Sequence, residues 1–439
     1  MDTMQVKRKI IFVVLSWFIF SFSEAQVKIN SIEEAQKYAL EHNYGRKMQE
    51  LRTSQAREQK QTANAFLYPT ISAGFNGQYN IDISETPVPG ELVGKPGETV
   101  YMKFGKEYAY TAGLNVSYNV LNWTSVYQSR IAAANVQLAQ ANSLYYEQQL
   151  RELVGQSYYA VITALQAEKI TEKSLLAADT IAQLTRKKFD EGLVDQLNLN
   201  QAIINKMQVE QQLQQTKAYT VQTTNQLKML LGISANDEIV LTETAPKEKV
   251  IGADGLQING DNKAEVLKQQ ENVATNEMKA ALSAFAPQLS LKGYFGANQY
   301  WNEFDFSFNS NDWRKSNYVG VSVTVPIFTG FANKSKYDAA KIQKRIAQTA
   351  YREEVANAEL QNNSLLKKYF SGINVVNVSF EKMSLSDENQ LLARQKYEQG
   401  LLSLSDYLEI FNSNLSAQNQ YLTALSDFRS VKATIDSRK

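Results

Sequence analysis

Carboxylates are the side chains of this sequence best suited to acid–base chemistry, because the chain of 439 residues has no cysteine and a single histidine, His42. Disulfides, thiolate zinc sites and cysteine nucleophiles are therefore excluded, and no imidazole cluster can hold a metal. One carboxylate pair, Asp406 and Glu409, is three residues apart and so shares a helix face, a turn apart. A carboxylate enzyme such as a glycosidase could use such a pair. Alternatively, Asp406 is a favourable first-turn residue of a helix that Ser403 caps.

This pair lies in a phrase that occurs twice, as "YEQGLLSLSDYLE" at 397–409 and "FDEGLVDQLNLN" at 189–200. Each phrase has one glycine, Gly400 or Gly192, inside a long tract without proline and with almost no other glycine. Because proline and glycine punctuate most folds, we predict two long helical tracts, each broken once. The two glycines would allow the positive φ that a tight helix reversal needs. We expect the tips of two helical hairpins near 189–198 and 397–406.

The uninterrupted tracts are too long for an ordinary domain. They run from Trp123 to Phe189 and from Gly330 to Tyr397, and at ~1.5 Å per residue each would span roughly 100 Å. Apolar residues recur in steps of three and four, which indicates coiled-coil packing. The net charge of +1 gives no basic footprint, so nucleic acid is not an expected partner.

Four other segments alternate apolar and polar residues with a period of two, as strands with one apolar face do. They are at least as long as the ~9–11 residues with which a tilted strand crosses a bilayer. Aromatic residues lie near their ends, as in the aromatic girdles of membrane barrels. A soluble β-sandwich would show the same alternation, but an export signal and the lack of a packing partner favour the membrane. The predicted strands are 70–84, 106–121, 288–301 and 316–328.

Four strands cannot close a membrane barrel, because the smallest barrels have about 8. An open sheet edge in lipid is not viable, so copies of the chain must supply the missing strands. The residues themselves do not choose among a dimer, a trimer and a tetramer.

The N-terminus has the features of a secretory signal. Three basic residues at 7–9 precede an apolar stretch at 10–22, which is too short for a comfortable membrane span. Ser23 and Ala25 fit the −3 and −1 positions of a cleavage site. We expect 1–25 to be a signal peptide that is removed after Ala25, so that Gln26 becomes the first residue. An uncleaved anchor helix is the alternative.

The two halves of the chain repeat one another. "AFLYPTISAGF" at 65–75 matches "AFAPQLSLKGY" at 284–294, which aligns Pro69 with Pro287. Each half then has two strands, a long helix, a tip and a return helix. We predict a first repeat at 26–232, a connecting segment at 233–261 and a second repeat at 262–439.

The strand–helix junctions of the two halves differ. "GLNVSYNVLNW" at 113–123 aligns with "GVSVTVPIFTG" at 320–330. Asn119 therefore stands where Pro326 does, and Trp123 stands where Gly330 does. Pro69, Pro287, Pro326 and Gly330 are the predicted junction residues.

The duplicated order, the "VPIFTG" at a strand end and the glycine-broken tips resemble the TolC family of outer-membrane efflux and secretion ducts. The resemblance covers essentially the whole expected mature chain. It implies a mainly α fold with a transmembrane β portion: a homotrimer with a roughly 12-stranded β-barrel, continued by a periplasmic α-helical tunnel. It implies outer-membrane lipid, a periplasmic adaptor (membrane fusion) protein and an inner-membrane transporter of resistance-nodulation-division or ABC type as partners. It implies no cofactor, no metal and no catalysis.

The resemblance also implies a constriction at the tips. Asp406 and Glu409 match positions that form acidic rings at the closed periplasmic entrance, where carboxylates would attract cations. Tyr397 matches a tyrosine of the family's closing bonds, but Leu402 replaces an arginine and Asn198 stands at a position that usually holds an acid. These residues can therefore form a Tyr397–Asn198 hydrogen bond but no ion pair. We expect the tip to be held closed more by apolar contacts of Leu402 and Leu404 than by charge. The helix-cap interpretation of Asp406 remains open.

Three functions are compared. The expected one is a passive outer-membrane exit duct for small-molecule efflux, energised by the inner-membrane transporter, with type I protein secretion as its alternative. An exported coiled-coil structural protein would need no membrane-length strands. A carboxylate enzyme would need a compact core, for which the long helices leave little room.

Overall fold

The computed structural model describes residues 27–243, 249–250, 252, 258 and 261–438. The expected signal peptide 1–25, its cleavage site and part of the connecting segment 233–261 lie outside the described residues. The chain divides into two compact units, which are treated separately below. The sheet unit comprises 52–140 and 266–352, and the helical unit comprises the described residues of 1–51, 141–265 and 353–439.

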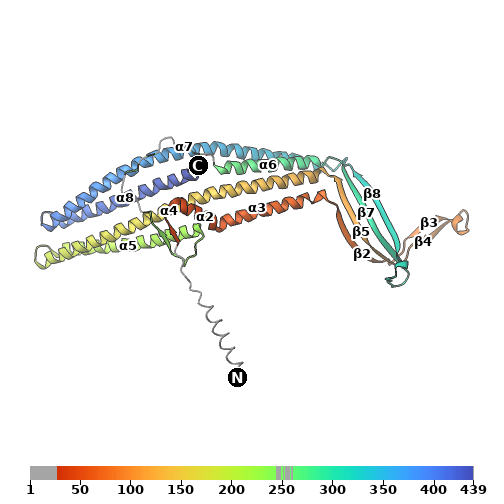
Figure 1. Cartoon of the computed structure of the whole chain (residues 1–439), viewed down its shortest axis with the longest axis horizontal. Coiled ribbons are helices and arrows are strands. Elements are labelled where there is room, and N and C mark those ends of the chain that lie inside the picture. Colours follow the sequence, from red (N-terminus) through yellow and green to blue (C-terminus); the bar gives the residue numbers. More distant parts are fainter. Residues whose placement is uncertain (1–26, 244–248, 251, 253–257, 259–260, 439) are drawn as a thin grey trace, which may run out of the picture. The chain divides into compact units, whose positions relative to one another are not determined.

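The sheet unit is built on one antiparallel sheet of four strands in the order β2-β5-β7-β8 (Figure 1). The first half of the chain supplies β2 and β5 and the second half supplies β7 and β8, so the repeats meet where β5 pairs with β7. The strands are β2 (Thr70–Tyr79), β5 (Tyr108–Leu121), β7 (Gln288–Trp301) and β8 (Arg314–Thr324).

β2 and β8 end earlier than the sequence predicted. Residues 80–84 and 325–328, which were expected to continue them, lie outside strands. Pro326 has no N–H with which to continue the ladder beyond β8. After β2, Asn80 N–H donates to the carbonyl of Glu107 at 2.7 Å, and the chain then leaves the sheet.

The connection between β2 and β5 contains a second, smaller sheet that the sequence did not reveal. β3 (Glu85–Pro89) pairs with β4 (Thr99–Lys103), and a short 3₁₀ helix, η2 (Gly90–Val93), joins them. β3 contains two prolines, although proline is rare in paired strands. A two-stranded ribbon tolerates them, since alternate N–H groups of each strand point away from the partner.

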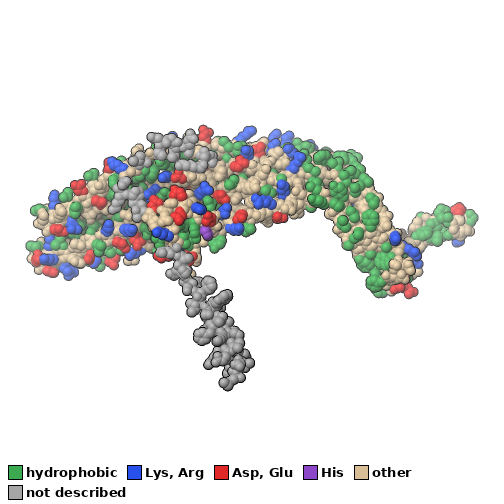
Figure 2. Space-filling model, in the orientation of Figure 1, with side chains coloured by type: hydrophobic (Ala, Val, Ile, Leu, Met, Phe, Trp, Pro, Cys, Tyr) green, Lys and Arg blue, Asp and Glu red, His purple; other side chains and the backbone are tan. Residues whose placement is uncertain are grey.

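The main sheet has one apolar and one polar face. The register places most aliphatic residues of the four strands on one side and most Ser, Thr and Asn residues on the other. Gln299 and Asn317 are exceptions that share the apolar face. Hydrophobic side chains accordingly cover much of the sheet in Figure 2. Among the described residues, neither β2 nor β8 has a partner along its outer edge. Exposed apolar residues of this face include Ile71, Phe75, Leu114, Leu291, Phe295, Val319, Val321 and Val323.

Among the described residues, the α-helices that adjoin the main sheet do so at one of its ends. A 3₁₀ turn, η1 (Asn64–Leu67), leads through Pro69 into β2, and α6 (Asn262–Ser283) leads through Pro287 into β7. β5 runs into α4 (Trp123–Asp190), whereas β8 reaches α7 (Ala332–Glu398) only after Pro326 and Gly330. Gly330 and Phe331 have φ of 59° and 64°, so this junction is a sharper turn than its counterpart at Trp123.

The long helical tracts predicted from the sequence are present. α4 has 68 residues and α7 has 67. The return helices of the two hairpins are α5 (Gln196–Leu231) and α8 (Leu404–Ser437), and the shorter helices are α2 (Ile32–His42) and α3 (Tyr44–Ala63).

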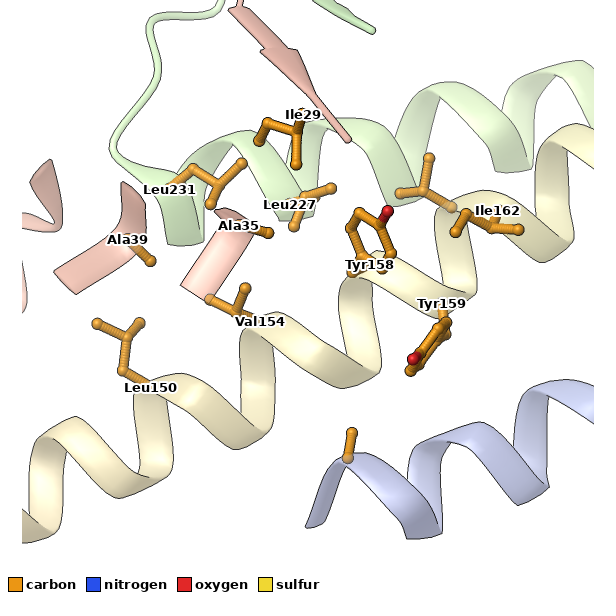
Figure 3. Packing of buried hydrophobic residues seen from close by; sticks show 12 residues of the cluster. Ile29, Ala35, Ala39, Leu150, Val154, Tyr158, Tyr159, Ile162, Leu227 and Leu231 are labelled. Atoms are coloured by element: carbon orange, nitrogen blue, oxygen red, sulfur yellow. The ribbon is translucent and has the colours of Figure 1, made fainter. Parts of the chain in front are cut away.

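A buried apolar cluster joins the elements of the helical unit (Figure 3). β1 (Val27–Ile29) pairs in parallel with β6 (Ile239–Leu241), and side chains from α2, α4 and α5 pack beneath them. Gly155 lets α4 approach α8 closely, because a Cβ there would lie 2.7 Å from the Cβ of Ala433. The core members are Ile29, Ala35, Ala39, Leu150, Val154, Tyr158, Tyr159, Val161, Ile162, Leu227, Leu231 and Ala433.

Replacing Leu227 with alanine should destabilise the helical unit by about 2–5 kcal/mol, because the side chain is completely buried and its removal leaves a cavity. Met229, two residues later on α5, is 68% exposed. Met229→Ala is the control and should stay within about 0.5 kcal/mol. Urea unfolding followed by helical circular dichroism measures both, and equal losses would contradict the assignment of Leu227 to this core.

Candidate functional site at the hairpin tips

The first hairpin turns at Gly192, whose φ is 74°. Leu193 N–H donates to the carbonyl of Lys188 at 2.8 Å, and Gly192 N–H donates to that of Phe189 at 2.9 Å. These bonds close the end of α4 in the manner of a Schellman motif. Asp195 then caps α5, accepting from Asn198 N–H at 2.9 Å, and its bonds to Asn198 hold the pKa of Asp195 below its usual value.

The second hairpin uses the same geometry. Gly400 has φ of 76°, and Leu401 N–H donates to the carbonyl of Lys396 at 2.8 Å. No atom lies within 4 Å of a Cβ placed on Gly192 or Gly400, so the backbone conformation is what favours glycine at both turns. Ser403 then caps α8.

Beneath the two tips lies one apolar cluster, called here the tip cluster. Tyr397, Tyr407 and Phe411 form a stacked row, with ring centroids 5.6 and 6.2 Å apart. Burial raises the pKa of Tyr407 to about 12, so its ring stays uncharged over the physiological range. The tip cluster comprises Ala178, Ile181, Ala182, Ala202, Val209, Ala393, Tyr397, Leu404, Tyr407 and Phe411.

Leu402 and Leu404 contact this cluster to different degrees. Leu404 is a buried member, whereas Leu402 is partly buried against it. Their neighbour Leu401 is 71% exposed. Leu402 and Leu404 therefore pack in or against a cluster that contains residues of both hairpins of one chain.

Two residues of α4 hold Tyr397, and together the three are called the tip clasp. The hydroxyl of Tyr397 lies 2.7 Å from Oγ1 of Thr185. Nζ of Lys188 donates to the carbonyl of Tyr397 at 2.6 Å and lies 4.2 Å from the centre of its ring, a cation–π distance. Burial raises the pKa of the Tyr397 hydroxyl, and the Thr185 bond partly offsets this shift.

The Tyr397–Asn198 hydrogen bond that the sequence allows does not form among the described residues of the chain. Tyr397 is 2% exposed and its hydroxyl is engaged by Thr185. The side chain of Asn198 instead donates to Oδ1 of Asp195 at 2.7 Å, within the cap of α5. The side chains of Tyr397 and Asn198 therefore bond Thr185 and Asp195, and not each other.

Sequence reasoning missed Thr185 and Lys188, although a signal was present. Ile181, Thr185 and Lys188 follow one another in steps of four and three, so they lie on the face of α4 that packs. Two polar residues in an apolar seam just before a tip indicate side chains that bond across the helices.

The acidic pair is exposed. Asp406 N–H donates to Oγ of Ser403 at 3.2 Å, and the hydroxyl of Ser403 lies 2.7 Å from Oδ2 of Asp406. The helix-cap interpretation of Asp406 is therefore confirmed. Glu409 lines an open groove of about 350 Å³ between α7 and α8, beside Lys396 and Leu402.

No group of three or more His, Asp or Glu side chains that could hold a metal occurs within the described ranges. Among those residues, no helix has both the length and the apolar character needed to cross a membrane.

The sequence model of the outer membrane efflux protein family matches residues 37–233 and 265–436. Antibiotic efflux pump outer membrane protein ArpC of Pseudomonas putida is 23% identical over 399 residues, covering 88% of this chain and 78% of ArpC. Cation efflux system protein CusC of Escherichia coli K12 is 22% identical over 427 residues, covering 92% and 84%.

Solved structures share the fold. The Campylobacter jejuni CmeC outer membrane channel superposes with a TM-score of 0.74 at 19% identity, covering 93% of this chain and 85% of CmeC. A structure of CusC gives 0.75 at 18% identity, covering 95% and 94%. The open state of the Neisseria gonorrhoeae MtrE channel gives 0.73 at 20% identity, covering 93% and 88%.

Removing either α4 partner of the tip clasp should loosen the end of α7. Thr185→Val leaves the buried Tyr397 hydroxyl unpaired, at a cost of ~1–3 kcal/mol, and Lys188→Met removes the cation–π contact, worth ~0.5–2 kcal/mol. Amide hydrogen exchange around Tyr397 should accelerate in both variants. The matched controls are Thr180→Val and Lys187→Met, whose side chains are exposed; equal acceleration in the controls would contradict the clasp.

Proposed function

The chain belongs to the outer membrane efflux protein family, and on this basis we propose that three copies form the exit duct of a multicomponent efflux pump. The observation that carries the proposal is the four-stranded sheet with one apolar face and two unpaired edges. As a member of this family the protein is an outer-membrane channel and not an enzyme, which sets aside both the glycosidase and the coiled-coil structural alternatives.

Trimeric assembly would solve the problem of the sheet edges. In a trimer, β8 of one copy pairs with β2 of the next, and the three sheets close a barrel of about 12 strands. The apolar face then contacts lipid and the polar face lines the lumen. The family and the relatives support the outer membrane as the location. The strand number calls for several copies, and the number three is what the family resemblance implies.

The hairpins would extend into the periplasm, with their tips at the entrance of the duct. In each copy the tip clasp holds the second hairpin against the first, which favours a closed resting entrance. Asp406 and Glu409 are exposed near this entrance, so three copies would place six carboxylates around it. Asp406 can serve both as a helix cap and as part of this ring, because its cap bonds do not bury the carboxylate.

The energy for transport would come from partners. Members of efflux pumps work with other components, and we infer a periplasmic adaptor protein and an inner-membrane transporter of resistance-nodulation-division or ABC type. The relatives are named for antibiotic and for cation efflux. We therefore propose small-molecule efflux as the function of this chain, with type I protein secretion as the alternative.

Replacing Val321 with arginine should impair barrel assembly by about 2–4 kcal/mol per strand if the residue lies near the bilayer midplane. Val321 is 67% exposed on the apolar face. Ser322→Arg is the matched control, because the next residue of β8 lies on the polar face and its arginine would point into the lumen. Light scattering of the purified protein in detergent should show a trimer for the parent and the control, with less trimer for Val321→Arg. A parent protein that conducts ions as a monomer would refute the assembly.

Replacing Asp406 and Glu409 together with alanine should lower the cation selectivity of the channel and weaken its block by multivalent cations. Trimer stability should change little, since both side chains are exposed. Conductance in planar bilayers measures this, with Asp427→Ala as the control, an exposed acid of α8 far along the helix from the tip. If the double variant conducts and selects as the parent does, the acids act only as local helix residues.

A further inference from the structure

The connection between β7 and β8, residues 302–313, folds back over the apolar face of the sheet. At its centre, the ring of Phe306 packs edge-on against Phe75 of β2 at 5.7 Å and against Tyr110 of β5 at 5.2 Å. Trp313 contacts Phe306 from the other end of the connection, at 6.0 Å. This segment, called here the β7–β8 loop, thus rests on three strands of its own sheet instead of extending into solvent.

A buried glutamine holds the β7–β8 loop in place through hydrogen bonds. Gln299 of β7 is fully buried, although its neighbours on this face are mostly apolar. Its Nε2 donates to the carbonyl of Ser307 at 3.2 Å, and its Oε1 accepts from Ser307 N–H at 3.1 Å. Indole N–H groups complete the set: Trp301 donates to Gln299 at 2.7 Å, and Trp313 donates to the Ser307 carbonyl at 3.0 Å.

These bonds fit a loop that lies against lipid. Irregular backbone is costly at an apolar boundary unless its N–H and C=O groups find partners within the protein. At Ser307, where the loop crosses the apolar face, both groups are paired with side chains. A loop in water would not need this, because water would satisfy the same groups.

The loop nevertheless exposes two large apolar side chains. Phe304 is 83% exposed and Phe308 is 91% exposed. The ring of Phe304 contacts that of Tyr108 and the ring of Phe308 contacts that of Phe306, with ring centres 5.7 and 4.9 Å apart. They continue the apolar face of the sheet at the end opposite to the helices.

We propose that the β7–β8 loop is a membrane anchor, which inserts Phe304 and Phe308 into the boundary between headgroups and acyl chains of the outer leaflet. The inference rests on the proposed function, since it needs the apolar face of the sheet to contact lipid. The helices leave the sheet at one end and would be periplasmic, so the loop lies at the external end. Aromatic residues concentrate at such interfaces, and the continuity of the loop with the apolar face identifies lipid as the occupant. Three copies would surround the barrel with such anchors.

The chain lacks cysteine, so single cysteines can report on each position. Phe304→Cys and Phe308→Cys, each labelled with a polarity-sensitive fluorophore, are reconstituted as full-length protein in phospholipid vesicles. Two kinds of quencher then report on the surroundings of the label. Nitroxides attached to the lipid headgroup or to the acyl terminus quench labels at the corresponding depth of the bilayer, and iodide quenches labels that are exposed to water. Val321→Cys on the apolar face and Ser322→Cys on the polar face serve as lipid and water references.

We expect labels at 304 and 308 to show blue-shifted emission and loss of emission with headgroup nitroxides, and less loss with acyl-terminal nitroxides. Quenching by iodide alone would place the loop in water, and protection from both quenchers would place it against another copy; either result overturns the anchor. The label at position 321 shows whether a negative result concerns the anchor alone or the proposed function as well. If 321 is quenched from lipid, only the anchor fails; if it is not, the membrane-spanning sheet fails as well.

Gln299→Leu in the Phe308→Cys background tests whether Gln299 positions the loop. The variant removes both bonds to Ser307, so lipid quenching at 308 should be lost while quenching at 321, measured in the corresponding double variant, persists. Unchanged quenching at 308 would overturn Gln299 as the residue that positions the anchor.

Discussion

A sheet edge must find a partner, and the architecture depends on this constraint. Each chain contributes four strands, so its sheet ends in two edges whose N–H and C=O groups are unpaired among the described residues. In hydrocarbon every such group costs several kcal/mol, and water cannot satisfy it. The apolar face of the same sheet favours the bilayer, while the edges forbid an isolated copy there. Assembly of several chains removes the conflict, so insertion and oligomerisation are expected to be coupled.

The helical unit is packed around separate buried clusters. The tip cluster joins α4, α5, α7 and α8, and one hydroxyl pair and one lysine on a tyrosine ring add to it. The cluster near β1 joins α2, α4, α5 and α8 to a strand that is itself paired with β6. Because the clusters are separate, the tips can open locally at the cost of their own contacts alone.

Most of the framework could be predicted from the sequence. The proline-free tracts and paired glycines gave the long helices and the positive φ at Gly192 and Gly400, and period-two alternation gave the four strands. The β3–β4 ribbon was missed because Pro87 and Pro89 argue against strands, and the ladder of a two-stranded ribbon is too short to leave a pattern. The bond between Tyr397 and Thr185 was not predicted, because the family resemblance pointed to Asn198 and not to the apolar seam of α4. A seam shows which face of a helix packs, but it does not show which polar atoms meet there.

The strength of the tip clasp bears on how a duct of this kind can open. The hydroxyl pair contributes ~0.5–1.5 kcal/mol and the cation–π contact ~0.5–2 kcal/mol. In the proposed trimer these would add to roughly 3–10 kcal/mol. Moving an equilibrium from mostly closed to mostly open takes about 5.5 kcal/mol of differential binding, which falls in the same range. A partner that bound the open tips better than the closed ones could therefore open the entrance without unfolding a helix. Because Lys188 bonds a backbone carbonyl and a ring, and not an acid, substitution of the tip carboxylates need not release the clasp. In the proposed duct, selectivity and closure would therefore depend on different residues and could vary independently.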